Sequence, residues 1–185
     1  PAARPPPRLP MTAATAAVED AVATLQPKSS ARIPREVPPL PKGMLPRKGI
    51  LDGIKRSLLA RPTAATEDIV ASLEGGTLLV QGMGGSGKTV VASSIARDLE
   101  VGIRFGTICF VGVGQDADLR ELQRSLHFQL AQRSLDPALS SEEEIFAALQ
   151  TVAKGQDVLL IIDDAWIPEQ VRRLTCVDPH TASRT

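Results

Sequence analysis

The sequence has few of the residues on which several classes of protein function depend. Among its 185 residues it has no tyrosine, one tryptophan, four phenylalanines, two histidines and two cysteines. Two cysteines cannot build a disulfide framework, so we expect a reducing, cytoplasmic environment. No apolar run reaches the length of about 18 residues that a transmembrane helix needs. The 21 basic and 21 acidic residues cancel, and this balance gives little support for nucleic-acid binding.

Proline is abundant at one end of the chain only. Eleven of the 15 prolines lie at or before Pro46, and the first 17 residues are dominated by Pro and Ala. Such a composition favours an extended or disordered segment. We therefore divide the chain into a disordered tail, residues 1–40, and a folded domain, residues 41–185. A targeting peptide is the alternative for the tail, but the acidic pair Glu19 and Asp20 argues against it.

A phosphate-binding loop is the most informative motif in the sequence. The stretch GMGGSGKT, residues 82–89, matches G-x-x-x-x-G-K-[ST], with an apolar run before it and a helix-compatible run after it. Its glycines let main-chain N–H groups point at a phosphate, and the following helix adds positive charge. Lys88 is expected to reach the β- and γ-phosphates, and the Thr89 hydroxyl to bind Mg²⁺. A chance glycine-rich turn is the alternative, which the strand and helix context disfavours. The predicted phosphate-binding residues are Gly82, Gly84, Gly85, Ser86, Gly87, Lys88, Thr89 and Val90.

Two aspartates follow a second apolar run. Residues 158–162 (VLLII) are apolar at every position, which is typical of a parallel strand covered by helices on both faces. Carboxylates at the C-terminal end of such a strand lie at the sheet edge where ligands bind in α/β folds. We expect Asp163 to hold Mg²⁺ and Asp164 to polarise an attacking water. The alternative is a pair of solvated acids that cap the next helix.

Periodicity and punctuation predict alternating helices and strands. Helices are expected over residues 49–60, 62–74, 90–99, 118–135, 141–153 and 167–177, and strands over residues 77–81, 106–113 and 158–162. Ser141 and Glu144 have the spacing of a capping box, and Pro168 suits the first turn of a helix. Strands that alternate with helices predict a parallel sheet with right-handed crossovers, in three α/β/α layers.

The two motifs resemble the NB-ARC subfamily of STAND P-loop NTPases, which includes animal apoptosome proteins and plant disease-resistance proteins. Many other P-loop families end this strand in hhhhDE or hhhhD, whereas LLIIDDAW has two aspartates, a small residue and Trp166. A third stretch, residues 37–48 (VPPLPKGMLPRK), resembles the segment that enters the NB-ARC domain. The resemblance covers about residues 37–185 and identifies residues 41–185 as a partial NB-ARC domain with the P-loop NTPase fold.

The resemblance also implies which residues border the base of the nucleotide. In the family, an apolar or aromatic residue and an arginine of the entry segment border the adenine, and the matching positions are Leu45 and Arg47. Arg47 has an alternative interpretation as a solvent-exposed linker charge. Trp166 is a candidate for stacking on adenine, but the family pattern favours packing behind the turn that carries the two aspartates.

The sheet order of the family bears on the end of the chain. In NTPases of this type a later strand lies between the phosphate-loop strand and the strand that ends in the acids, and it carries the residue that senses the γ-phosphate. The sequence ends at Thr185, where that strand would begin, and Arg184 would be its entry. We therefore expect a domain that is C-terminally incomplete.

These features predict a nucleotide-dependent switch that binds ADP or ATP with Mg²⁺ and hydrolyses ATP slowly, with Lys88 and Asp164 as catalytic residues. The resemblance implies that bound ADP marks the resting state and that ATP drives self-association or contact with other signalling proteins. Two alternatives stay open. One is an efficient P-loop ATPase of another class, against which Asp164 and Trp166 argue, and the other is a truncated scaffold that does not hydrolyse nucleotide.

The thermal stability of the chain tests the expectation of an incomplete sheet. Without a central strand, main-chain groups of both neighbours would lack partners, and each buried one costs about 1–3 kcal/mol. We expect the chain by itself to be marginally stable and Mg·ADP to raise its melting temperature, as measured by circular dichroism. A sharp transition above about 60 °C without ligand would contradict this expectation.

Overall fold

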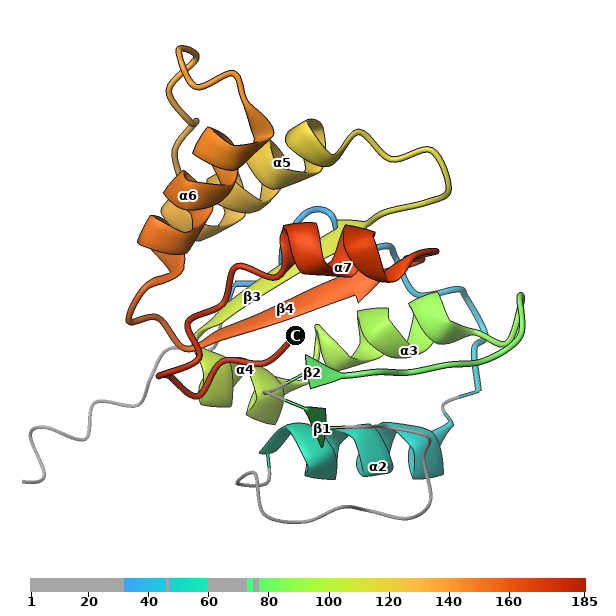
Figure 1. Cartoon of the computed structure of the whole chain (residues 1–185). Helices are drawn as coiled ribbons and strands as arrows, with labels where there is room; N and C mark the ends of the chain where they lie inside the picture. The colour runs from blue at the N-terminus through green and yellow to red at the C-terminus, as the bar shows by residue number, and fades with distance from the viewer. Residues whose placement is uncertain (1–31, 46, 60–72, 75–76) are drawn as a thin grey trace, which may run out of the picture.

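The computed structural model of this chain describes residues 32–45, 47–59, 73–74 and 77–185 (Figure 1). The elements within these ranges are α2 (Lys48–Leu59), β1 (Leu73–Glu74), β2 (Thr77–Leu78), α3 (Lys88–Ile95), α4 (Leu99–Phe105), β3 (Thr107–Gly112), α5 (Leu119–Ala131), α6 (Glu142–Ala153), β4 (Val158–Asp163) and α7 (Pro168–Leu174). The predicted disordered tail lies largely outside the described residues, although Val37, near its end, is buried in the core. The boundary between residues 40 and 41 stays a prediction.

Two parallel strands, β3 and β4, form the centre of the fold. They pair in register from Thr107 opposite Val158 to Gly112 opposite Asp163. Successive side chains of a strand point to opposite faces, and both strands are buried over most of their length. Each strand therefore supplies apolar side chains to both faces, which explains why neither sequence shows an alternation of polar and apolar residues.

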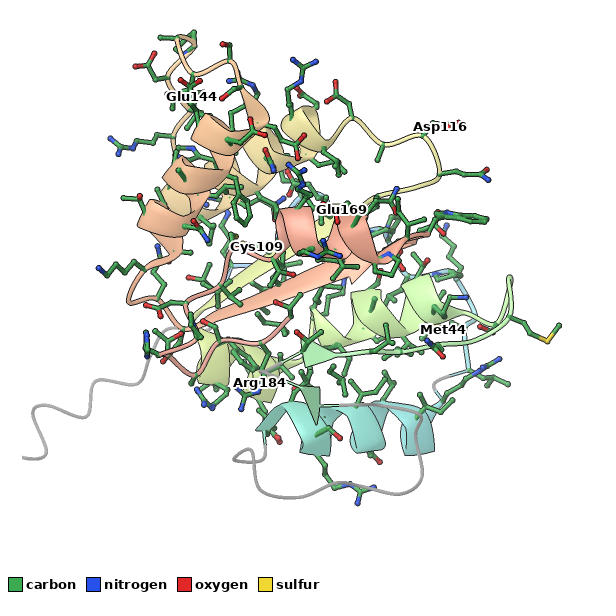
Figure 2. The ribbon with its side chains drawn as sticks, in the orientation of Figure 1. Met44, Cys109, Asp116, Glu144, Glu169 and Arg184 are labelled. Atoms are coloured by element: carbon green, nitrogen blue, oxygen red, sulfur yellow. The ribbon has the colours of Figure 1, made fainter. Side chains whose placement is uncertain are left out.

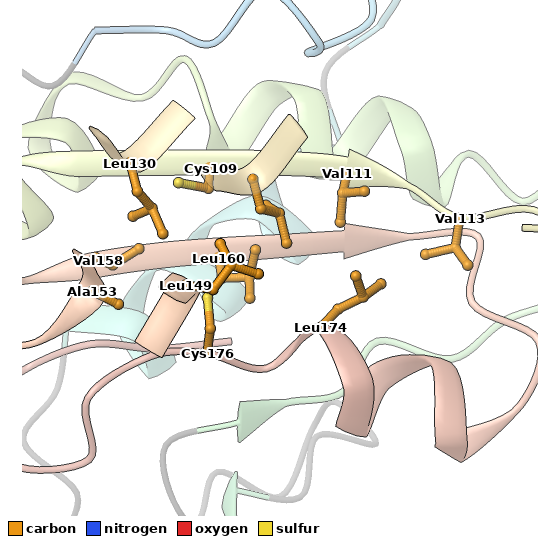
Figure 3. Close-up of a cluster of buried hydrophobic side chains, with 11 residues drawn as sticks. Cys109, Val111, Val113, Leu130, Leu149, Ala153, Val158, Leu160, Leu174 and Cys176 are labelled. Carbon is orange, nitrogen blue, oxygen red and sulfur yellow. The ribbon is translucent and has the colours of Figure 1, made fainter. Parts of the chain in front are cut away.

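Helices cover both faces of this pair of strands (Figure 1). On one face α2, α3 and α4 bury a cluster that includes Ile54, Leu58, Ile95, Val101, Phe105, Ile108, Phe110 and Leu159. On the other face α5, α6 and α7 bury a cluster that includes Cys109, Val111, Leu126, Leu130, Leu149, Ala153, Val158, Leu160 and Leu174 (Figure 3). The predicted α/β fold, a parallel sheet flanked by helices in three layers, is confirmed.

The last residues of the chain lie between β4 and β2. The N–H of Arg184 donates to Val158 O at 2.8 Å, and Leu160 N–H donates to Arg184 O at 2.8 Å. On the other side, Leu78 N–H donates to Thr185 O at 2.7 Å. Figure 1 shows the C-terminus between these two strands. Arg184 and Thr185 thus occupy the position that the family resemblance predicts for the beginning of a central strand.

The strand before the phosphate loop is shorter than predicted. A strand was expected over residues 77–81, but β2 contains only Thr77 and Leu78, which pair antiparallel with Glu74 and Leu73 of β1. The predicted helix over residues 62–74 is wrong at its end, where Leu73 and Glu74 form β1, and its remainder lies outside the described residues. Two glycines separate β1 from β2 in the sequence, a connection that favours a tight hairpin over a helix end.

Two short helices replace the single helix expected over residues 90–99. α3 ends at Ile95, and Asp98 caps a new helix, α4, because its carboxylate accepts hydrogen bonds from the N–H groups of Glu100 and Val101. Lys55 of α2 donates to the same carboxylate at 2.8 Å. The aspartate preceding an apolar stretch was an N-cap signal that helical periodicity alone did not reveal.

Other helix boundaries agree with the sequence. The predicted capping box begins α6: Glu144 N–H donates to Ser141 Oγ, and Ser141 N–H donates to the Glu144 carboxylate. The main-chain N–H groups of Ser141 and Ser140 hold the pKa of Glu144 below its usual value. Pro168 is the first residue of α7, as predicted. α5 ends at Ala131 rather than at residue 135 because Gln132 adopts a left-handed conformation, with φ of 53°.

Both cysteines are free and buried in the core. Burial raises the pKa of the Cys109 thiol, and it raises the pKa of Cys176 to about 11. Both groups are therefore uncharged thiols at neutral pH, in the second of the two hydrophobic clusters. In the part of the chain that the structure describes, no helix combines the length and the apolar character needed to cross a membrane.

A side chain closes the outer edge of β3. Gln129 of α5 is buried, its Oε1 accepts a hydrogen bond from Phe110 N–H at 2.8 Å, and its Nε2 donates to Phe110 O at 2.9 Å. One amide side chain thus makes the two hydrogen bonds that a neighbouring strand would otherwise make. This pairing satisfies main-chain groups on a buried edge of β3 and fixes α5 against the sheet.

Replacement of Gln129 tests the contribution of this pairing to stability. Gln129→Leu leaves the buried N–H and C=O of Phe110 without partners, which should lower the free energy of unfolding by about 2–4 kcal/mol. Gln150→Leu, on the exposed side of α6, is the matched control and should change it by less than about 0.5 kcal/mol. The free energies follow from urea denaturation, and equal losses in the two variants would refute the assigned role.

Candidate functional site

The predicted phosphate loop forms a turn between β2 and α3 whose shape depends on glycine. Gly85 and Gly87 have φ of 74° and 87°, the left-handed region that side chains disfavour. At Gly82 a Cβ atom would lie 3.0 Å from Ser86 Oγ, so a side chain there would force a shift. The loop is tightened by a hydrogen bond from Ser86 N–H to Met83 O at 3.1 Å. Two of its four glycines thus have a backbone conformation that favours glycine, and a third lies close to the Ser86 side chain.

The Lys88 side chain folds back over this loop. Lys88 is the first residue of α3, and its Nζ donates to Gly82 O at 2.7 Å and to Met83 O at 3.0 Å. Both carbonyls belong to exposed residues, so phosphate oxygens can replace them as acceptors without burying an unpaired group. The ammonium group is therefore held at the loop before any anion arrives.

The beginning of α3 lacks the side-chain cap that neighbouring helices have. Asp98, Asp118 and Ser141 cap α4, α5 and α6 through their side chains, whereas Gly87, the N-cap of α3, has no side-chain oxygen. The first N–H groups of a helix have no acceptor within the helix and carry its positive partial charge. The exposed hydroxyl of Thr89 lies in this first turn. This end of α3 suits an anionic ligand.

The two aspartates sit in a turn that extends the pairing of β3 with β4. Val113 N–H donates to Asp163 O at 2.9 Å, and Gly114 N–H donates to Asp164 O at 3.0 Å. Asp164 has a positive φ of 56°, which is uncommon for a residue other than glycine. Within the described residues, the structure gives neither carboxylate a hydrogen bond or an ion pair. Both carboxylates are available to a ligand.

The structure brings the phosphate loop and the aspartate turn to the same edge of the sheet. α3 packs against β4, and the start of α3 and the end of β4 point to the same side in Figure 1. Within the described part of the chain, no three His, Cys, Asp or Glu residues cluster in a way that could hold a metal by themselves. A metal ion at this edge would need ligand oxygens and water in addition to Thr89 and Asp163.

Two other candidate residues remain predictions. Leu45 and Arg47 lie before α2, and both are exposed, with Leu45 exposed at 88% of its surface. Exposure is compatible with a contact to adenine and equally with the alternative of a solvent-exposed linker for Arg47. Asp116, an acid that the sequence did not single out, lies at the outer turn of the loop between β3 and α5 (Figure 2).

The packing position predicted for Trp166 is wrong. Its side chain is 58% exposed, and the neighbouring Ile167 is exposed as well. The physical reason is the short connection: the chain leaves the sheet at Asp164, and Pro168 already begins α7. In the part of the chain that the structure describes, no other element covers Trp166.

Two surface hollows of the described residues lie away from the phosphate loop. One of about 460 Å³ is bordered by residues 32–36, the start of β3 and the end of α5. Another of about 530 Å³ lies between α6 and the segment that follows α5, beside His127. Neither contains Lys88 or Asp163. The candidate site is therefore described by its loop geometry and its charges.

A comparison with known protein families matches the part of the chain that contains the phosphate loop and the two aspartates. The sequence model of the NB-ARC domain matches residues 63–185, which is more than half of the chain. A probable disease resistance protein of Arabidopsis thaliana is 34% identical over 110 residues, which are 58% of this chain and 12% of that protein. Disease resistance RPP13-like protein 4, also from Arabidopsis thaliana, is 29% identical over 85 residues, 46% of this chain and 10% of that protein. The chain thus spans only a small part of the length of these relatives.

Substitution of Asp164 tests whether the turn selects its residue by backbone conformation. Asn tolerates positive φ about as well as Asp, whereas Ala does not, at a cost of about 1 kcal/mol. We expect Asp164→Ala to lower the free energy of unfolding by about that amount and Asp164→Asn to leave it nearly unchanged, as measured by urea denaturation. Equal losses in both variants would instead point to the charge of the carboxylate.

Proposed function

The chain belongs to the NB-ARC family, and from this premise we propose that it is the nucleotide-binding part of a molecular switch that binds ADP or ATP with Mg²⁺ and hydrolyses ATP slowly. One observation carries the proposal. The glycine-dependent loop holds the Lys88 ammonium group at 2.7 and 3.0 Å from its own carbonyls, next to the uncapped start of α3. Such a loop concentrates main-chain donors and one cation where a phosphate chain can be bound.

Lys88 and the loop N–H groups bind the phosphates in this proposal. On nucleotide binding, Nζ exchanges the carbonyls of Gly82 and Met83 for phosphate oxygens, which are stronger acceptors because they are charged. The helix N-terminus contributes positive charge at the same place. The residues assigned to this contact are Gly82, Gly84, Gly85, Ser86, Gly87, Lys88, Thr89 and Val90.

Thr89 and Asp163 fit a magnesium ion by the chemistry of their donors. A hydroxyl and a carboxylate are hard oxygen ligands, and Mg²⁺ commonly uses only one or two protein ligands beside phosphate oxygens and water. The carboxylate of Asp163 has no partner among the described residues, and it is only half-buried. When bound, Mg²⁺ would neutralise phosphate charge.

Asp164 is assigned to the hydrolytic step. Its exposed carboxylate lies next to Asp163 in a turn fixed by main-chain pairing, and we assign it to orient a water for in-line attack on the γ-phosphate. Lys88 would stabilise the negative charge that develops during this attack. Slow turnover is the expectation carried over from the family, in which bound ADP holds the resting state.

The signalling role extends beyond the described residues. The named relatives are disease resistance proteins that are much longer than the matched regions. We propose that self-association or contact with other signalling proteins, in the cytoplasm, follows the exchange of ADP for ATP. The adenine contacts of Leu45 and Arg47 and the domain limits at residues 41–185 belong to the same proposal.

Nucleotide titration of a lysine variant tests this proposal. We expect isothermal titration to give measurable ADP binding to the wild type in Mg²⁺. We also expect Lys88→Ala to weaken it by at least about tenfold, because a charge-assisted hydrogen bond contributes about 1.5–3 kcal/mol. Lys154→Ala, which removes an exposed lysine that follows α6, is the matched control. Equal heats for wild type and Lys88→Ala would support the scaffold, and steady-state turnover above about 1 s⁻¹ would support an efficient ATPase.

A further inference from the structure

We propose that Gln170 is a positioning residue for the aspartate turn, an inference that rests on the proposed function. Gln170 is the third residue of α7, and its side chain is buried, with 6% of the residue exposed. Its Oε1 accepts hydrogen bonds from Trp166 N–H at 2.8 Å and Ile167 N–H at 3.2 Å, and its Nε2 donates to Gly114 O at 3.2 Å. One buried amide thus joins the loop after β4 to Gly114, which is 56 residues from Gln170 in the sequence.

These hydrogen bonds hold the loops that follow β3 and β4 at the ligand edge of the sheet, which is the edge where the phosphate loop and the aspartate turn lie. β4 ends at Asp163 and the loop after it begins at Asp164, whereas the loop after β3 begins at Val113 and Gly114. Gly114 donates its N–H to Asp164 O and accepts from Gln170 with its own carbonyl. The aspartate turn is therefore fixed on one side by the sheet pairing and on the other by Gln170.

A helix cap explains only part of this arrangement. Gln at the third position of a helix commonly reaches back to the N–H of the N-cap residue, here Ile167. That local function needs Oε1 alone. The hydrogen bond from Nε2 to Gly114 adds nothing to the cap, and it connects α7 to a different loop.

The position of the turn decides where the Asp163 carboxylate meets a metal-bound nucleotide. Side chains that orient a metal ligand without touching the metal typically change metal affinity by about 10–100-fold when they are lost. The bond to Gly114 limits the movement of the turn relative to β3. Gln170 accordingly acts on the site through Asp163 and Asp164, and it contacts no ligand itself.

Gln170→Glu separates the two functions of this side chain. A glutamate keeps an oxygen for the N–H groups of Trp166 and Ile167, and so it keeps the helix cap. As a carboxylate it has no N–H to donate to Gly114 O, and it places one of its own oxygens against that carbonyl oxygen. Its additional negative charge would attract Mg²⁺, so a loss of Mg²⁺ dependence cannot come from charge alone.

The first measurement is the ratio of ADP affinities with Mg²⁺ and with EDTA, obtained by isothermal titration of the full chain. We expect Gln170→Glu to reduce the gain from Mg²⁺ by about tenfold, with affinity in EDTA within about twofold of wild type. Gln150→Glu makes the same chemical change at an exposed position of α6 and should keep the full gain. An undiminished gain in Gln170→Glu would overturn the inference.

The second measurement needs no nucleotide. Trp166 is the only tryptophan of the chain. Its main-chain N–H donates to the Gln170 side chain, so the decay of its fluorescence anisotropy reports local motion of the turn. We expect a larger amplitude of fast depolarisation in Gln170→Glu than in wild type and Gln150→Glu. An identical decay in all three proteins would refute the positioning role, whereas absent ADP binding by the wild type would refute the proposed function.

Discussion

The parallel pairing of β3 with β4 is the constraint on which the rest of this structure depends. The pairing continues past the ends of the strands, because Val113 and Gly114 donate their N–H groups to the carbonyls of Asp163 and Asp164. The two loops at this edge therefore leave the sheet at the same level. The acids owe their position to the register of the sheet, and the helices on either face hold that register by burying the alternate side chains of both strands.

Buried amide side chains connect the helices to this frame. Gln129 of α5 pairs with the main chain of Phe110, Gln170 of α7 bonds to Gly114, and Gln123 of α5 donates to Arg173 O at 2.9 Å. All three bind main-chain groups that the regular strands and helices leave open. An amide suits this purpose because it offers a donor and an acceptor without the desolvation cost of a charge. The chain thus uses polar residues in its interior to fix the relative position of elements that apolar packing alone would hold less specifically.

The ligand edge combines this fixed frame with groups that are free to bind. α3 begins without a side-chain cap, the Lys88 ammonium group rests on exposed carbonyls, and the carboxylates of the aspartate turn have no partners among the described residues. The positive charge of Lys88, at the start of α3, and the negative charges of the aspartates, at the end of β4, lie at the same edge of the sheet. In the proposed function, a nucleotide with Mg²⁺ satisfies both at once.

Local sequence was sufficient for features that depend on neighbouring residues. The apolar runs of β3 and β4, the capping box of Ser141 and Glu144, and the glycine pattern of the phosphate loop determined their own structures, because burial, capping and backbone conformation act over a few residues. Tertiary structure decided what depends on distant partners. β2 is short because a strand needs a neighbour, and its neighbours here are β1 and Thr185. The exposure of Trp166 and the contacts of Gln129 and Gln170 follow from sheet register and helix placement, to which residues far apart in the chain contribute jointly and which no single stretch of sequence encodes.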